Sequence, residues 1–471
     1  MARADRRRRR GFAGAVFRWA PIVLVLAMFG AAVASYHFDV ATRWFGAAPD
    51  PQPTPAPSPG PTLAGPLPAR PVARPAPTAQ PVAGAVRRAL AAPLADPALA
   101  ELHAVVAPLQ GPALLTRGHG LVMPASSLKL FTAAAALHAL GPDHTFATRV
   151  LRRGPHTVTL VGGGDPFLAD RTPKPGSAPD ASLQVLARRT ADRLKADGNR
   201  RIGVDYDASL FTGPDMSPHW PAAYLSDQVA SPITALWADE GVAADGSRRV
   251  DDPAATAAAD FAAYLAADGV HVVWTPRERV ARPGAREVAR VTSLPLSDIV
   301  ERVLETSDNQ GAEVLARQVG LAVSGRASFT GAVDGVRQVL GTLGIALHGA
   351  RWYDGSGLSR EDRIDPRTLV AVLQVAADSG HPELRAVLTG LPVASFTGSL
   401  SGRFDQTSGG GWVRAKTGTL RGTSALAGLA TDARGRLMVF AFVSNHVADL
   451  GTLDAEAALD RLASALAGCR C

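Results

Sequence analysis

A serine and a lysine stand three residues apart, at Ser126 and Lys129, in the segment PASSLKLFTAAAALHAL. Alanine and leucine dominate the residues after Pro124, so the sequence predicts a helix over 126–140. Side chains three positions apart on a helix share one face, so the amine reaches the hydroxyl and can withdraw its proton. A serine at the helix start also lies near the positive end of the helix dipole, which stabilises an anionic tetrahedral intermediate. The pattern predicts serine acyl-transfer chemistry with the lysine as base.

Two further motifs follow in the chain. Ser307-Asp308-Asn309 stands between two stretches of helical periodicity, and the segment from Lys416 to Thr419, KTGT, lies in an apolar strand pattern. Each motif alone is a weak signal, because Ser and Asn are common at caps and turns. The three motifs in this order, on a helix, a helix junction and a strand, are together specific.

Lysine is rare in this chain, which makes the motif lysines informative. Of 49 basic residues only four are lysines, and two of these are Lys129 and Lys416. A guanidinium cannot give up its proton, whereas the pKa of a desolvated lysine can fall from about 10.4 toward neutrality. Base chemistry at these positions therefore requires lysine. We interpret Lys174 and Lys195 as solvated surface charges.

Other classes of function find little support. The eleven histidines are dispersed without HExxH spacing, and no GxSxG motif occurs, so neither a zinc protease nor an α/β-hydrolase is indicated. We expect no metal at the site and no cofactor. The net charge is +7, but six arginines and one aspartate in the first ten residues supply +5 of it. The near-neutral remainder argues against a nucleic-acid partner.

The N-terminal region has the pattern of an export segment. A cationic tip precedes the apolar run 19–36, which ends in small residues. The run is almost long enough to cross a bilayer, so a cleaved signal peptide and a retained membrane anchor both fit. The Pro-rich stretch 51–84 predicts an extended spacer. We expect the remainder to lie in the cell envelope, outside the cytoplasm, either membrane-anchored or secreted.

Residues 85–471 mix helical and strand patterns. Strands and helices are segregated rather than strictly alternating, so we predict an α+β fold in which an antiparallel sheet packs against helices. Helices are predicted over 126–140, 182–197, 252–268, 328–343, 366–378 and 452–467, with two more meeting at 307–309, and strands over 146–153, 156–163, 201–207, 270–274, 412–420, 424–432 and 436–445. The predicted divisions are a basic tip with a signal or anchor helix (1–45), a Pro-rich linker (46–84), a catalytic domain in two parts (85–149 and 291–471) and an inserted accessory domain (150–290).

At these motifs the sequence resembles the D-alanyl-D-alanine carboxypeptidase/endopeptidase family of class C low-molecular-mass penicillin-binding proteins, the penicillin-binding protein 4 type. The resemblance covers about 90–468 and rests on the blocks PASSLK, GGGDPFL, SDNQGAEVLAR, YDGSGLSR and AKTGTL. It implies a β-lactamase/penicillin-binding-protein-like transpeptidase fold. Ser307 follows Lys129 by 178 positions, and the length of this stretch resembles the inserted domain of that family. The insert is shorter than in the longest members, which predicts a reduced or missing third subdomain.

The resemblance also implies roles for the motif residues. Ser126 would attack the carbonyl of the penultimate D-alanine of a peptidoglycan peptide and form an acyl-enzyme, while Lys129 takes its proton. Ser307 and Lys416 would pass a proton to the leaving D-alanine, and Asn309 would hold the substrate amide. Water then releases the peptide. β-Lactams would act as covalent inhibitors that acylate the same serine.

Substrate binding is implied for the third motif. Thr417 and Thr419 would bind the terminal carboxylate, with Gly418 between them. The backbone N–H groups of Ser126 and Thr419 would form the oxyanion hole. Arg360 is a candidate for contact with the peptide's side chain, for example a diaminopimelate carboxylate.

Several residues near these blocks have plainer interpretations. We interpret Asp308 as structural and Asp165 as a turn residue. We interpret Gly355 and Gly357 of the YDGSGLSR block as residues that set the backbone conformation of a loop near the site. Trp220 and Tyr224 are candidate walls of the side-chain pocket, with packing as the favoured alternative. The two cysteines, Cys469 and Cys471, lie within the last three positions of the chain. We expect a frayed tail there.

Two alternative functions stay open. The same fold supports a β-lactamase or a serine esterase. A non-catalytic module that binds or organises the cell wall on a stalk is a second possibility, against which the retained motif lysines argue. Carboxypeptidase and endopeptidase activities share these residues, so the sequence does not separate them.

Overall fold

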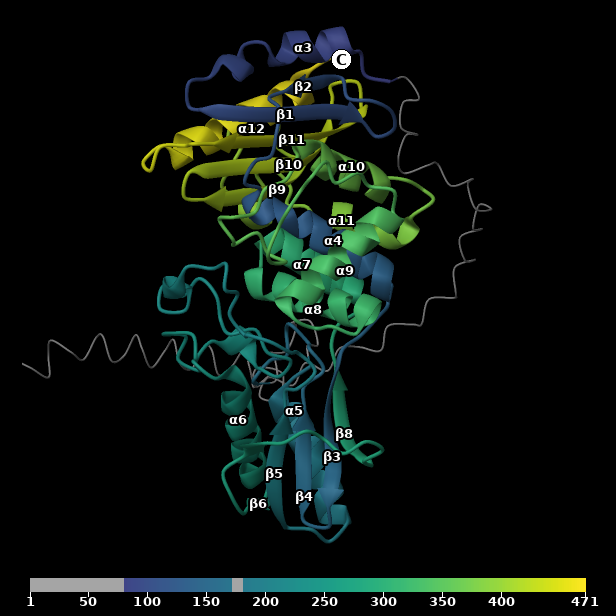
Figure 1. Ribbon diagram of the computed structural model, residues 1–471, viewed down its shortest axis with the longest axis vertical. Helices are drawn as coiled ribbons and strands as arrows, with labels where there is room; N and C mark the ends of the chain where they lie inside the picture. Colours follow the sequence, from purple (N-terminus) through teal and green to yellow (C-terminus); the bar gives the residue numbers. More distant parts are fainter. Residues whose placement is uncertain (1–79, 172–180) are drawn as a thin grey trace, which may run out of the picture. The chain divides into compact units, whose positions relative to one another are not determined.

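The computed structural model describes residues 80–171 and 181–471 (Figure 1). The predicted export segment and nearly all of the Pro-rich spacer lie outside the described residues. The last two residues of the predicted spacer already belong to helix α3 (Ala83–Leu90). Within the described part of the chain, no helix is long and apolar enough to cross a bilayer.

The first sheet has five antiparallel strands and contains the KTGT motif at its edge. Three of its strands match the prediction, and the inner strand β1 and the short edge strand β2 were not predicted. The order across the sheet is β2 (Leu115–Arg117), β1 (Glu101–Pro108), β11 (Leu437–Asn445), β10 (Thr423–Thr431) and β9 (Val413–Leu420). The motif strand β9 pairs with β10 on one edge, and on its other edge Arg414 forms a bridge with Val393.

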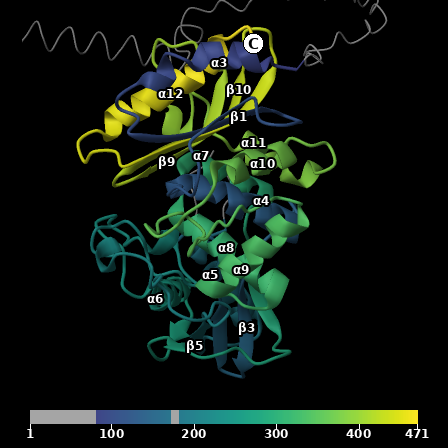
Figure 2. The ribbon, with the colours of Figure 1, turned by 45° about the horizontal axis from the view of Figure 1, so that its top comes forward.

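Helices cover both faces of this sheet, which explains why its strands are apolar on both sides. Alternate residues of β11 belong to two separate cores: Val443 packs with α4 and α10, and Phe442 packs with α3 and α12. Figure 2 shows α3 and α12 on one face and the other helices on the opposite face. The helices are α4 (Lys129–Leu140), α7 (Leu296–Thr306), α8 (Asn309–Ser324), α9 (Phe329–Thr342), α10 (Pro366–Ala376), α11 (Arg385–Thr389) and α12 (Thr452–Gly468).

A second sheet of six strands lies between the first two motifs in the sequence. Its path is β6 (His271–Val272), β5 (Arg201–Asp207), β4 (Thr157–Val161), β3 (Ala147–Gly154) and β8 (Glu287–Thr292), with β7 (Arg277–Glu278) also paired to β5. Helices α5 (Leu183–Ala196) and α6 (Pro253–Ala267) pack on it. This sheet is mixed: β3 is antiparallel to β4 and β8, whereas β5 is parallel to β4, β6 and β7. The intervening α5 carries the chain back to the starting end, and such a crossover makes the flanking strands parallel.

The C-terminal end is packed rather than frayed. Cys469 and Cys471 are buried and joined by a disulfide. The carbonyl of Cys471 accepts a hydrogen bond from the Val82 N–H at 2.8 Å, and that of Cys469 accepts one from the Ala433 N–H at 2.9 Å. Both cysteines join the core formed by α3, α12 and the first sheet. The predicted frayed tail is therefore wrong, because apolar burial and backbone hydrogen bonds hold these residues.

Candidate active site

The Ser-x-x-Lys motif forms the junction between a 3₁₀ turn, Ala125–Leu128, and α4. Side chains three positions apart nearly eclipse in a 3₁₀ turn. The Lys129 Nζ accordingly lies 2.8 Å from the Ser126 Oγ, which confirms the predicted contact. The residue before the serine, Ala125, has a φ of 48°, a left-handed conformation that is costly for alanine. The serine thus lies on a strained turn, half-buried at the start of the helix.

The Gly357 backbone contributes to that turn. A Cβ at this glycine would come within 2.0 Å of the Ala125 carbonyl oxygen, and its φ is +82°. Both the space and the conformation exclude other residues here. The YDGSGLSR loop therefore lies directly against the turn that presents the serine.

Lys129 is fully buried and makes three polar contacts. Besides the serine, its Nζ contacts the Asn309 Oδ1 and the Ser356 carbonyl oxygen, both at 2.8 Å. Burial lowers the pKa of Lys129 to about 8, against the opposing effect of nearby carboxylates. In the neutral amine, two N–H groups donate hydrogen bonds to the Asn309 and Ser356 oxygens. The lone pair of the nitrogen is then free to accept the Ser126 hydroxyl proton. This is the arrangement that a general base requires.

The Ser-Asp-Asn motif forms the junction between α7 and α8, as predicted. Ser307 ends α7 in the left-handed region with a φ of 62°, and Asp308 caps α8 by accepting the Gly311 N–H at 2.7 Å. The structural role predicted for Asp308 is confirmed. Asn309 begins α8 and contacts Lys129, whereas the Ser307 hydroxyl has no hydrogen bond recorded among the described residues.

Lys416 is the second buried lysine of the site, on β9. Burial lowers its pKa well below the ordinary value, and the charge of Lys129 acts in the same direction. Its Nζ donates to the Thr417 carbonyl at 2.9 Å. Because the two amines repel each other as cations, protonation of one favours the neutral form of the other.

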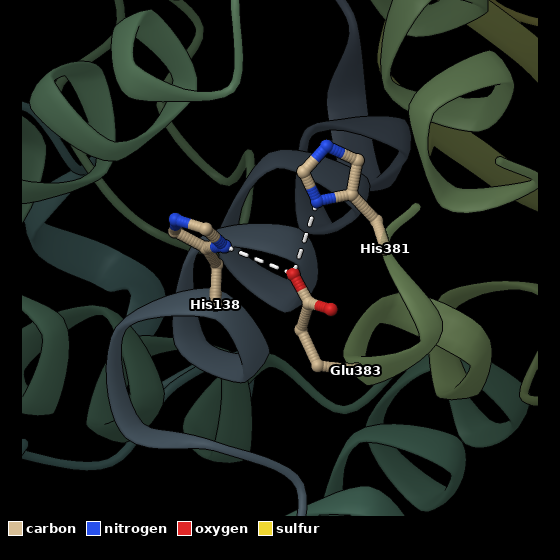
Figure 3. Close-up of side chains that lie close together, drawn as sticks. All are labelled: His138, His381 and Glu383. Carbon is tan, nitrogen blue, oxygen red and sulfur yellow. Dashed lines mark hydrogen bonds and ion pairs between the residues drawn. The ribbon is translucent and has the colours of Figure 1, made fainter. Parts of the chain in front are cut away.

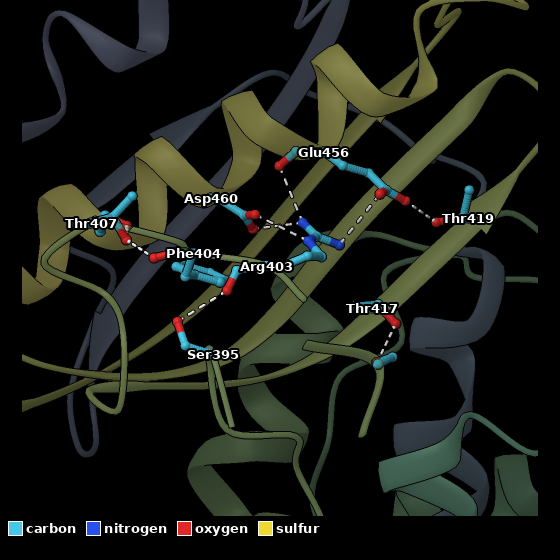
Figure 4. A network of polar contacts seen from close by, with 10 residues as sticks. Ser395, Arg403, Phe404, Thr407, Thr417, Thr419, Glu456 and Asp460 are labelled. Carbon is cyan, nitrogen blue, oxygen red and sulfur yellow. Dashed lines mark hydrogen bonds and ion pairs between the residues drawn. The ribbon is translucent and has the colours of Figure 1, made fainter. Parts of the chain in front are cut away.

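The threonines of the third motif already have partners (Figure 4). The Thr417 and Ser399 hydroxyl oxygens lie 2.8 Å apart, and the Thr419 hydroxyl donates to the Glu456 carboxylate at 2.7 Å. Arg403 pairs with Asp460 at 2.6 Å and with Glu456 at 3.9 Å. A hydroxyl carries one proton, so Thr419 must turn from Glu456 before it can donate to a substrate carboxylate.

Gly418 lets β9 approach the serine turn closely. A Cβ there would lie 2.7 Å from the Pro124 carbonyl oxygen and 3.1 Å from the Ser127 nitrogen. We expect Gly418→Ala to push the strand from the turn, lowering the acylation rate by about 10–100-fold and stability by about 1–3 kcal/mol. Acylation kinetics with a fluorescent penicillin and thermal unfolding measure both effects. The control is Gly402→Ala, where an added Cβ meets nothing within 4 Å; equal losses in both variants would contradict this account.

A buried carboxylate beneath the site was not predicted from the sequence. Glu313 on α8 accepts the Ser356 N–H at 2.8 Å and the Gly355 N–H at 3.0 Å. Burial raises its pKa, with the charge of Asp354 adding to the effect. It therefore holds the backbone of Ser356 on the N-terminal side of the carbonyl that accepts from Lys129. A charged residue inside the apolar helix segment AEVLARQVG was the one available signal.

Of the three residues proposed to line a pocket for the substrate side chain, one is exposed and two are buried. Arg360 is exposed at the end of the YDGSGLSR loop. Trp220 and Tyr224 are buried, and they donate to the Asp354 carboxylate at 2.7 Å and the Leu358 carbonyl at 3.2 Å. The packing interpretation fits these two residues, which tie their segment to the loop. Asp165 accepts the Phe167 N–H at 2.9 Å, which confirms a turn residue.

The fold and the site define a class of serine acyl-transfer enzymes, in which a buried lysine faces the nucleophile between a helical layer and the edge of an antiparallel sheet. The sequence profile of the D-Ala-D-Ala carboxypeptidase 3 (S13) family matches residues 86–245 and 242–466. Carboxypeptidase DacB of Mycolicibacterium smegmatis is 36% identical over 467 residues, covering 96% of this chain and 96% of the relative. Carboxypeptidase Rv3627c of Mycobacterium tuberculosis is 37% identical over 398 residues, covering 81% and 84%.

The fold is similar to a crystal structure of penicillin binding protein 4 (dacB) from Haemophilus influenzae. The TM-score is 0.67 at 23% identity, and the match covers 80% of this chain and 97% of that chain. The chain belongs to the D-Ala-D-Ala carboxypeptidase 3 (S13) family. The predicted family, fold class and enzyme class, a serine-type D-Ala-D-Ala carboxypeptidase, are confirmed.

Proposed function

We propose that this protein removes the terminal D-alanine from peptidoglycan stem peptides through an acyl-enzyme on Ser126. The observation that carries the proposal is the 2.8 Å contact between the Lys129 Nζ and the Ser126 Oγ, made by an amine whose pKa burial lowers to about 8. An amine of this kind is neutral in a substantial fraction of molecules near physiological pH. It can therefore accept the hydroxyl proton as the serine attacks.

In the proposed reaction, a named group accepts or donates the proton at each step. As the Ser126 Oγ bonds to the carbonyl carbon of the penultimate D-alanine, its proton passes to the Lys129 Nζ. The tetrahedral intermediate then breaks its C–N bond, and the leaving nitrogen receives a proton by way of Ser307 and Lys416. Water attacks the resulting ester and gives one proton back through the lysine, which restores the serine and frees the shortened peptide.

The edge of β9 suits an extended peptide substrate. Over Lys416–Leu420 no ladder partner is recorded on its outer edge within the described residues, so a substrate strand can pair there. In our proposal the backbone N–H groups of Ser126 and Thr419 form the oxyanion hole, Asn309 holds the substrate amide, and Thr417 and Thr419 bind the terminal carboxylate.

The setting of the enzyme is part of the proposal. A cationic tip and an apolar run at 19–36 support export, and the Pro-rich stretch supports a spacer between the envelope membrane and the folded part. We retain both a cleaved signal and a membrane anchor, and we retain the division into a catalytic domain with an insert at 150–290. Endopeptidase activity on cross-linked peptides uses the same residues. Arg360 is proposed to meet a carboxylate on the substrate side chain.

Covalent labelling by a penicillin tests the nucleophile. We expect intact-protein mass spectrometry to show one added penicillin per chain in the wild type and none in Ser126→Ala, because only the serine oxygen forms the acyl bond. The control is Ser127→Ala, since the Ser127 hydroxyl donates to the Pro124 carbonyl at 2.7 Å and has no part in the reaction. Labelling of Ser126→Ala, or no labelling of the wild type, would contradict the assignment.

A second measurement separates the open alternatives. A carboxypeptidase releases D-alanine from a D-Ala-D-Ala peptide and turns over β-lactams slowly, whereas a β-lactamase on this fold does the reverse. A wall-binding module without catalysis gives neither product. Crystal structures of the Haemophilus influenzae protein include one complexed with a β-lactam, which supports penicillin binding by proteins of this fold.

A further inference from the structure

Three potential metal ligands converge at the C-terminal end of α4, at the opposite end from the serine. The Nδ1 atoms of His138 and His381 each lie 3.1 Å from the same carboxylate oxygen, Oε1 of Glu383. One donor atom from each of the three side chains lies within 4.8 Å of the other two. Figure 3 shows both rings turning one nitrogen toward the carboxylate and the other away from it.

These separations are close to those of a zinc site. Zinc binds imidazole nitrogen and carboxylate oxygen at about 2.0–2.2 Å, so neighbouring ligand atoms in a tetrahedral site lie about 3.3 Å apart. Both nitrogen-to-oxygen separations already match, and a small ring rotation adjusts the third. As hydrogen bonds alone, both rings must place their Nδ1–H donors on one oxygen. A zinc ion instead accepts the lone pairs of both nitrogens and of the oxygen.

Local charge and access also favour a cation. The Glu383 carboxylate is an anion, and His138 lies in the last turn of α4, at the negative end of the helix dipole. The side chains are 26–34% exposed, which leaves room for an ion to enter and for water to complete its coordination. Imidazole and carboxylate together suit zinc better than they suit calcium or magnesium.

The grouping is unusual among the histidines of the described residues. His219 contacts Glu361 as a simple pair. Glu101 contacts two histidines, but through different oxygens, His103 by Oε1 and His446 by Oε2. Across residues 80–171 and 181–471, His138, His381 and Glu383 are the one set of three such side chains whose donor atoms gather within 4.8 Å.

We propose that His138, His381 and Glu383 bind one zinc(II) ion, with water as the fourth ligand, and that the ion fastens the last turn of α4 to the segment leading into α11. Its role is structural. Lys129 lies nine residues earlier, about 13 Å along the helix, so the ion is remote from the acyl-transfer chemistry. The two histidines are 243 positions apart in the sequence, so no short spacing motif indicates the site.

Zinc titration of the full chain tests the proposal. After treatment with a chelator and its removal, we expect calorimetry to show one Zn²⁺ bound per chain, and a rise of a few degrees in Tm at roughly a hundredfold excess over Kd. His381→Ala and Glu383→Gln should each weaken this binding at least about tenfold. Circular dichroism of each variant verifies that it is folded.

The matched control is His446→Ala, which removes an exposed histidine that also contacts a glutamate. Its zinc affinity should equal that of the wild type. The proposal is overturned if zinc does not saturate at one ion per chain, or if the folded His381→Ala and Glu383→Gln variants bind zinc as tightly as the control. Either result would leave the trio as a hydrogen-bonded cluster. Penicillin labelling of Ser126 is independent of these outcomes.

Discussion

Replacing Lys129 with arginine is expected to slow acylation of Ser126 by about 10³-fold, because a guanidinium keeps its proton and cannot act as a base. The substitution retains a positive charge near the carboxylates that surround the site. A loss of rate therefore reports the loss of proton acceptance rather than the loss of charge. Stopped-flow measurement with a fluorescent penicillin, together with D-alanine release, gives the rates.

The pH dependence provides a second readout of the same base. Burial lowers the pKa of Lys129 to about 8, and only the neutral amine accepts a proton, so the wild-type acylation rate should rise with pH through about 8 and then level. The residual rate of Lys129→Arg should lack this rise. Lys195→Arg is the matched control, because Lys195 is a partly exposed lysine paired with Asp192 at 3.2 Å. A variant at position 129 that retains the wild-type pH profile would contradict the role of the lysine.

Local sequence patterns predicted the elements whose structure is decided locally. The Ala/Leu-rich segment 126–140 is helical, and the two apolar runs around Ala433-Arg434-Gly435 form the β10–β11 hairpin. β1 was missed although it is an inner strand of the first sheet. It pairs over three residues with the nearby β2 and over its whole length with β11, where Glu101 lies opposite Asn445, and nothing near residue 101 in the sequence specifies a partner as distant as β11.

The site likewise contains residues that the sequence identified and contacts that only the tertiary structure shows. Residue type and order were sufficient to select Ser126, Lys129 and Asn309, whose side chains the structure brings into contact. The third contact of Lys129 is a backbone carbonyl, that of Ser356, and a carbonyl leaves no trace in residue type. The carboxylate of Glu313, on a different helix, accepts the N–H groups of Gly355 and Ser356 just before that carbonyl. Only the tertiary structure brings these atoms together.

Glu313 should accordingly behave as a positioning residue for the base. We expect Glu313→Ala to lower kcat/KM for D-alanine release by roughly 10²-fold, since the Ser356 and Gly355 N–H groups lose their acceptor and the Lys129 amine loses a fixed partner. Glu313→Gln retains an amide oxygen in the same place and should recover most of the activity. Steady-state kinetics with a D-Ala-D-Ala peptide measures both variants.

The pH profile distinguishes positioning from a general loss of stability. Ionised Glu313 raises the pKa of Lys129, so an uncharged glutamine at this position should move the midpoint of the acylation profile to lower pH. A purely structural defect would reduce the amount of active enzyme without moving that midpoint. Glu278→Ala, at an exposed glutamate on β7, serves as the control and should leave rate and midpoint unchanged. An unshifted midpoint in Glu313→Gln, at full folded content, would mean that the buried carboxylate supports the loop but does not act on the lysine.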